Sequence, residues 1–99
     1  MTIEDWRAEI DEIDNELLRL LNVRARLAIR VGESKRSAGL SVLDGARERE
    51  VIERARRANA GPLDDAAVAR LFRRIIQESR RAEAAALEES ASRLEEALR

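Results

Sequence analysis

The chain has 99 residues, in which 19 lysines and arginines nearly balance 20 aspartates and glutamates, and it contains no histidine and no cysteine. These counts exclude disulfides, thiolate catalysis and imidazole bases, remove the commonest zinc ligands, and give nucleic-acid binding no support from net charge. Aromatic residues make up 2% of the chain, which argues against base stacking and β-sheet cores. The opening segment is acidic from Glu4 and no apolar run could span a membrane, so we expect a soluble cytoplasmic protein.

The first predicted helix covers residues 3 to 36, with an N-cap indicated by Thr2 and Asp5. Its apolar side chains recur in alternating steps of four and three residues, which is typical of one face of an amphipathic helix. These side chains are Trp6, Ile10, Ile13, Leu17, Leu20, Leu27 and Val31. A helix of this length spans about 50 Å. It cannot bury its apolar face against two shorter helices of its own chain, so we expect a second copy as its partner.

A loop is predicted where the helical period fails, at residues 36 to 43. The second helix, residues 44 to 59, begins at Asp44, a favourable N-cap, and ends before Gly61-Pro62.

The third helix, residues 64 to 95, is capped by Asp64 or Asp65. We expect its charged and alanine-rich end, residues 88 to 99, to fray. The fold class is therefore all-α: three helices in one domain, residues 1 to 99, that form an intertwined homodimer.

Charged and polar residues interrupt the apolar faces of these helices. Arg24 occupies an apolar position, and because burial of an unpaired guanidinium costs several kcal/mol, we expect a carboxylate or a ligand as its partner. Lys35 lies about 16 Å further along nearly the same face, so both cations face one cavity. On the third helix, Ser79 and Glu83 continue the apolar stripe with polar groups.

Three residues at the start of the second helix, Asp44, Arg47 and Glu48, share a face as well. The combined cations and carboxylates suit a small, multiply anionic, hydroxylated ligand. Arg7 lies about 25 Å from Arg24 on another face, so in an antiparallel dimer we expect it to enter the partner's site.

Each of these residues also has a purely structural interpretation. Arg24 could set the register of a dimer, Asp44 could act only as a cap, and Ser79 could bond back to its own helix. Lys35 could compensate a helix dipole, and Glu83 could lie at the edge of the apolar stripe. Arg7, Arg47 and Glu48 could lie on solvated faces.

The order and spacing of five segments resemble the AroQ class of all-helical chorismate mutases, from about Ile3 to Leu87. The segments are WRAEIDEID (6–14), LLRLLNVR (17–24), VGESK (31–35), DGARER (44–49) and LFRRIIQES (71–79). The resemblance implies an isomerase that converts chorismate to prephenate in phenylalanine and tyrosine biosynthesis, as a homodimer and without cofactor or metal.

The resemblance also implies a role for each site residue. The groups that would contact the substrate carboxylates are Arg24, Arg47, Ser79 and, from the other subunit, Arg7. Glu48 and the backbone near Asp44 would hold the ring hydroxyl. Lys35 and Glu83 would face the ether oxygen whose bond breaks. Well-known members carry glutamine at the position of Glu83, and since an ionised carboxylate cannot donate a hydrogen bond, we expect Glu83 to act in its protonated form.

Two other functions compete with this one. An isochorismate pyruvate-lyase resembles this fold and pocket, although Asp44 and the complete loop before it favour the mutase. A non-catalytic dimerisation or regulatory module, for instance one that binds a shikimate-pathway enzyme, would gain nothing from burying Arg24, Ser79 and Glu83 on one face.

Overall fold

The computed structural model describes residues 1–99 as three α-helices without β-strands. Helix α1 runs Ile3–Ser37, α2 runs Gly45–Ala58 and α3 runs Asp65–Ala97. The predicted all-α class is confirmed. Helix α3 ends at Ala97, two residues beyond the predicted end at residue 95. No helix combines the length and apolar character needed to cross a membrane.

Each helix begins at a side-chain cap. The Thr2 hydroxyl accepts a hydrogen bond from the Asp5 backbone N–H at 3.2 Å, and the Asp5 carboxylate accepts one from the Thr2 N–H at 2.9 Å. Asp44 caps α2, and Asp64 caps α3. Because these caps satisfy backbone donors that the helices leave unpaired, they fix where each helix starts.

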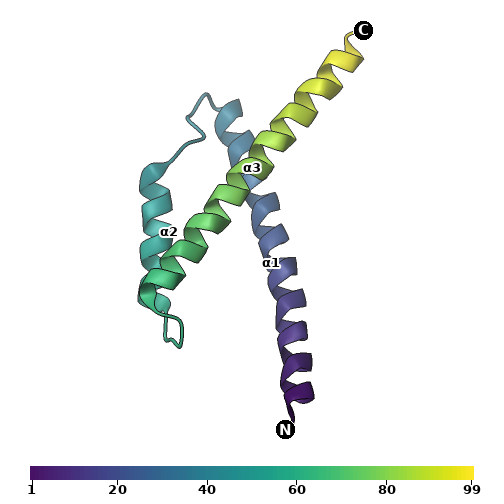
Figure 1. Ribbon diagram of the computed structural model, residues 1–99. Coiled ribbons are helices and arrows are strands. Elements are labelled where there is room, and N and C mark those ends of the chain that lie inside the picture. Colours follow the sequence, from purple (N-terminus) through teal and green to yellow (C-terminus); the bar gives the residue numbers. More distant parts are fainter.

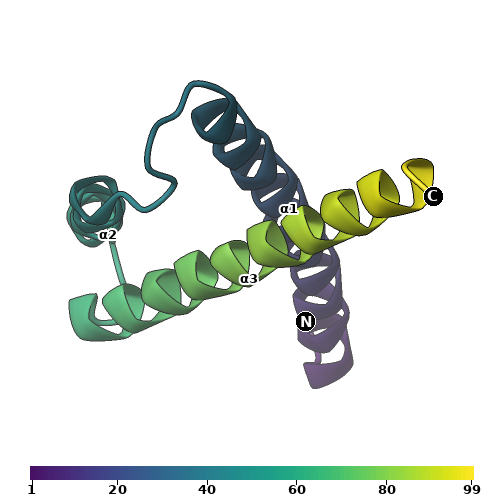
Figure 2. The ribbon, with the colours of Figure 1, turned by 90° about the horizontal axis from the view of Figure 1, so that it is seen from above.

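Helix α3 holds the molecule together, because both other helices pack against it and not against one another. It crosses α1 and lies alongside α2, as the two views show (Figures 1 and 2). Only five residues are buried, and four of them belong to α3: Val68, Ala69, Ile76 and Ser79. The fifth is Gly32 of α1. The small core therefore follows α3.

The N-terminal half of α1 projects away from the other helices (Figure 1). Its apolar face is solvent-exposed, with 51% of Trp6 and 64% of Ile13 accessible. The chain exposes 8049 Å², whereas a compact monomer of this mass exposes about 5,700 Å². Its radius of gyration is 17.8 Å, against about 13 Å for a compact chain of this length. The chain alone thus leaves the long apolar face of α1 uncovered, as its length predicted.

Candidate active site

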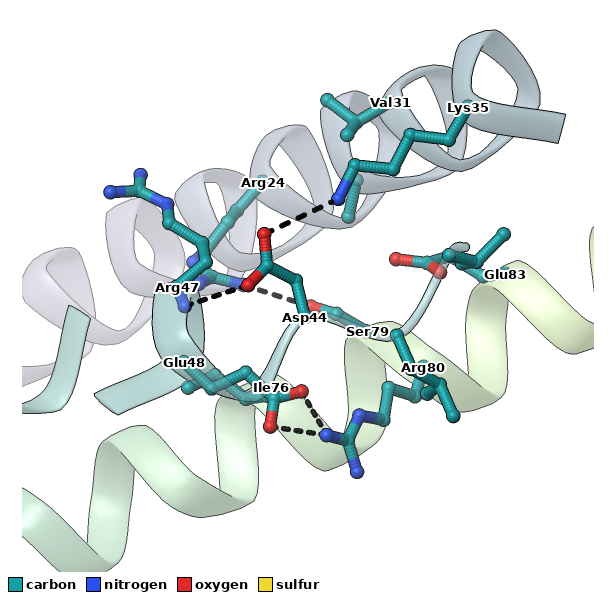
Figure 3. Close-up of a pocket in the computed structure, with 13 residues that line it drawn as sticks. Arg24, Val31, Lys35, Asp44, Arg47, Glu48, Ile76, Ser79, Arg80 and Glu83 are labelled. Atoms are coloured by element: carbon teal, nitrogen blue, oxygen red, sulfur yellow. Dashed lines mark hydrogen bonds and ion pairs between the residues drawn. The ribbon is translucent and has the colours of Figure 1, made fainter. Parts of the chain in front are cut away.

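A cavity of about 170 Å³ lies between α1, the segment before α2, α2 and α3 (Figure 3). Seven of the eight site residues expected from the sequence line it: Arg24, Lys35, Asp44, Arg47, Glu48, Ser79 and Glu83. The remaining walls include apolar side chains such as Val31 and Ile76. Side chains from three separate helices therefore meet in one small, highly charged pocket.

Arg24 reaches across this pocket from α1 to α3. Its Nη1 donates a 3.0 Å hydrogen bond to the hydroxyl of Ser79, which is only 7% exposed. A carboxylate or a ligand was expected as the partner of Arg24. Within the chain, no carboxylate forms an ion pair with it, and two of the pocket carboxylates pair with Lys35 and Arg80. A hydroxyl orients the guanidinium without neutralising it, so the charge of Arg24 remains available to an anionic ligand.

Lys35 and Asp44 face one another in the same pocket, with 3.6 Å between Nζ and Oδ2. Asp44 also accepts a 3.0 Å hydrogen bond from the backbone N–H of Arg47. That hydrogen bond, aided by the charge of Lys35 and opposed by partial desolvation, holds the pKa of Asp44 below its usual 3.8. Asp44 thus serves both as the cap of α2 and as the counter-ion of Lys35.

Arg47 and Glu48 differ in their surroundings although they are neighbours in sequence. The Arg47 guanidinium is half-exposed and lies 2.8 Å from Glu50, which matches the solvated ion pair considered for it. Glu48 is less exposed and forms an ion pair with Arg80 of α3 (Figure 3).

Arg80 lines the pocket and was not among the residues expected from the sequence. Arginines are frequent in this part of α3, at positions 70, 73, 74 and 81, so residue type alone does not distinguish it. The available signal was its position four residues after Ile76, which places it beside the buried stripe.

Glu83 is half-buried and lies where α3 passes α1. A Cβ atom added to Gly32 would stand 3.4 Å from its Oε2 atom, so the backbone of α1 forms one wall around this carboxyl group. Glu83 is not ion-paired with Lys35, whose carboxylate partner is Asp44.

Arg7 lies outside the pocket. Its side chain is 72% exposed and its guanidinium lies 3.9 Å from Glu4 on the same helix. No group of three or more carboxylates is arranged to hold a metal ion.

These features describe an all-helical protein whose charged pocket is built jointly by its three helices. The family model of chorismate mutase type II matches residues 6–84. The chain belongs to this family, and the resemblance noted in its sequence is confirmed.

Individual relatives agree with this assignment. A chorismate mutase from Methanocaldococcus jannaschii is 31% identical over 92 residues, which cover 92% of this chain and 93% of the relative. A chorismate mutase structure from Thermus thermophilus superposes with a TM-score of 0.79 at 34% identity, covering 82% of this chain and 92% of that one. A bifunctional chorismate mutase/prephenate dehydratase from Aquifex aeolicus is 44% identical over 78 residues, and the match covers 75% of this chain but only 22% of the relative.

Proposed function

We propose that this chain rearranges chorismate to prephenate, a precursor of phenylalanine and tyrosine. The observation that carries the proposal is the convergence of cations from all three helices on one cavity with apolar walls. The cations are Arg24 and Lys35 of α1, Arg47 of α2 and Arg80 of α3. Such a pocket suits a small dianion, and chorismate carries two carboxylates.

The reaction needs neither a general base nor a nucleophile, because it is a concerted Claisen rearrangement. One C–O bond breaks while one C–C bond forms, and no proton is transferred. The protein contributes by confining the flexible side chain of the substrate in a chair-like conformer and by placing donors where negative charge develops on the ether oxygen. A chain without histidine or cysteine can supply both.

The carboxylates of the substrate would bind to the guanidinium groups. Arg24, oriented by Ser79 and not neutralised by it, is available for a charge-assisted hydrogen bond. Arg47 flanks the same cavity and could exchange its exposed partner Glu50 for substrate, because exposed ion pairs contribute little energy.

The hydroxyl and the ether oxygen of the substrate would meet the other polar groups. The carboxylate of Glu48 would accept a hydrogen bond from the ring hydroxyl, and the backbone N–H at Asp44 would donate one to it. Lys35 would donate a hydrogen bond to the ether oxygen from one side, and Glu83 would face that oxygen from the other. Asp44 would orient Lys35 through their ion pair.

We further propose that two copies of the chain form an intertwined dimer. The apolar face of α1 is exposed in the single chain, and in a symmetric dimer the same face of a second α1 would bury it. Beside the main pocket lies another cavity that shares Arg24 and Arg47 with it and is lined by Val51, Ala55 and Phe72. The start of a partner's α1 could enter there with Trp6, which would bring Arg7 of the partner subunit to the substrate carboxylates.

Incubation of the purified chain with chorismate tests the proposed activity. Loss of chorismate with formation of prephenate is the expected result, and the Arg24→Ala variant should be strongly impaired as a control. Release of pyruvate from isochorismate in place of prephenate formation would identify a pyruvate-lyase. Absence of both reactions would indicate a non-catalytic module.

A further inference from the structure

Glu48 has a single cationic partner in the pocket, and that partner is Arg80. One Nη atom of Arg80 donates to both oxygens of the Glu48 carboxylate. The other pocket cations are engaged elsewhere: Lys35 with Asp44, Arg24 with Ser79 and Arg47 with Glu50. The direction in which the Glu48 carboxylate points therefore depends on Arg80.

From this contact we propose that Arg80 is a positioning residue, which fixes and neutralises Glu48 so that this carboxylate can accept a hydroxyl of an anionic substrate. The inference rests on the proposed function, in which Glu48 meets the ring hydroxyl. An ionised carboxylate has about four acceptor sites, so it can bind Arg80 and a hydroxyl together.

Charge gives a second reason for the pairing. A bare carboxylate inside the pocket would repel a dianionic substrate, and the repulsion would be strong where water is partly excluded. Glu48 is only 28% exposed at its side chain. The guanidinium of Arg80 offsets that charge at close range, so a hydrogen-bond acceptor can lie in a pocket that binds anions.

A purely structural role as a link between α2 and α3 explains the pair less well. The Arg80 side chain is 46% exposed, and ion pairs this accessible contribute little to folding stability. Arg81 provides a matched control, because it is the next residue on α3, pairs with Glu78 at 2.8 Å and does not line the main pocket.

The test compares chorismate with an analogue in which hydrogen replaces the ring hydroxyl. We expect Arg80→Ala to lower kcat/KM for chorismate by about tenfold or more, the effect of losing one charge-assisted hydrogen bond. Arg80→Lys should restore most of this loss, and Arg81→Ala should behave like the parent. With the analogue, Arg80→Ala should lose less activity than with chorismate, because the repulsion by Glu48 remains but there is no ring hydroxyl contact to lose.

A double variant separates positioning from packing. The Glu48→Gln variant lacks the negative charge with which Arg80 pairs. In this background, Arg80→Ala should cause little further loss of kcat/KM with chorismate. Equal losses with both substrates, or undiminished activity of Arg80→Ala, would overturn the inference. If Arg80→Ala fails to fold, the same comparisons between Arg80→Lys and Arg80→Gln decide. A parent chain without activity on chorismate would instead refute the proposed function.

Discussion

The guanidinium of Arg24 and the hydroxyl of Ser79 are joined by a 3.0 Å hydrogen bond although 55 residues separate them in sequence. The bond links α1 to α3 at the pocket wall, and Ser79 is one of the few buried residues of the chain. Arg24 is consequently held in one orientation before any substrate arrives, which lowers the entropic cost of binding.

Replacement of Ser79 by alanine should therefore impair catalysis more than folding. A hydrogen bond to a charged group contributes about 1.5 to 3 kcal/mol, so we expect kcat/KM to fall about tenfold or more. Steady-state kinetics with chorismate measure the effect, and Ser79→Thr, which keeps a hydroxyl, is the control. Full activity of Ser79→Ala would show that Arg24 needs no such support.

Lys35 should contribute mainly to kcat, because in the proposed mechanism its positive charge stabilises the negative charge that develops on the ether oxygen in the transition state. By analogy with removal of an oxyanion-hole donor, Lys35→Ala should lower kcat by about 10² to 10³. Lys35→Arg keeps the charge in a planar group of different shape and should be intermediate. An effect confined to KM would assign Lys35 to ground-state binding.

Glu83 should contribute through a hydrogen bond donated to the ether oxygen. An ionised carboxylate cannot donate such a bond, whereas the amide of glutamine can. Glu83→Gln should therefore keep or raise kcat, and Glu83→Ala, which has no donor, should lower it. Steady-state kinetics with chorismate provide the comparison, and equal kcat values for the two variants would remove Glu83 from this role.

Acid should weaken the start of α2 through Asp44. The pKa of this carboxyl is lowered in the folded chain, so its charged form stabilises the fold at pH values above about 4, and the contribution is lost as the pH falls through the lowered pKa. Asp44→Asn keeps a capping acceptor without the charge. Its thermal midpoint, followed by circular dichroism, should depend less on pH below about 4 than that of the parent. Parallel pH dependences would contradict this origin of the stability.

Subunit exchange should restore activity to a mixture of two inactive variants. In the proposed dimer, Arg7→Ala and Arg24→Ala homodimers would each contain two damaged pockets, but a mixed dimer would contain one intact pocket and one that carries both substitutions. Equal mixtures that exchange freely should regain about a quarter of the parental sites. If activity does not return although native mass spectrometry detects mixed dimers, each pocket is built from one chain.

The sequence predicted best those relationships that a single helix determines. The rise and period of a helix place Arg24 and Lys35 on nearly the same face, and both line the pocket. Local capping chemistry likewise predicted that Asp44 is the N-cap of α2.

Relationships between helices could not be predicted in the same way. The hydroxyl partner of Arg24 and the pairing of Glu48 with Arg80 depend on how α1 and α2 lie against α3. Residue spacing within one helix holds no information on that arrangement. The end of α3 at Ala97 differs from the predicted residue 95 by two residues, because the terminal residues are exposed and only their intrinsic helix preference indicates where the helix ends.

The absence of packing between α1 and α2 has a consequence for how such a site changes in evolution. The separation of Arg24 from Arg47 is determined by the way each helix rests on α3, and Ile76 is a buried side chain of α3 that also lines the cavity. A change in the volume of Ile76 would alter the width of the pocket without any change in its ionic residues. New ligand preferences could therefore arise from apolar substitutions alone.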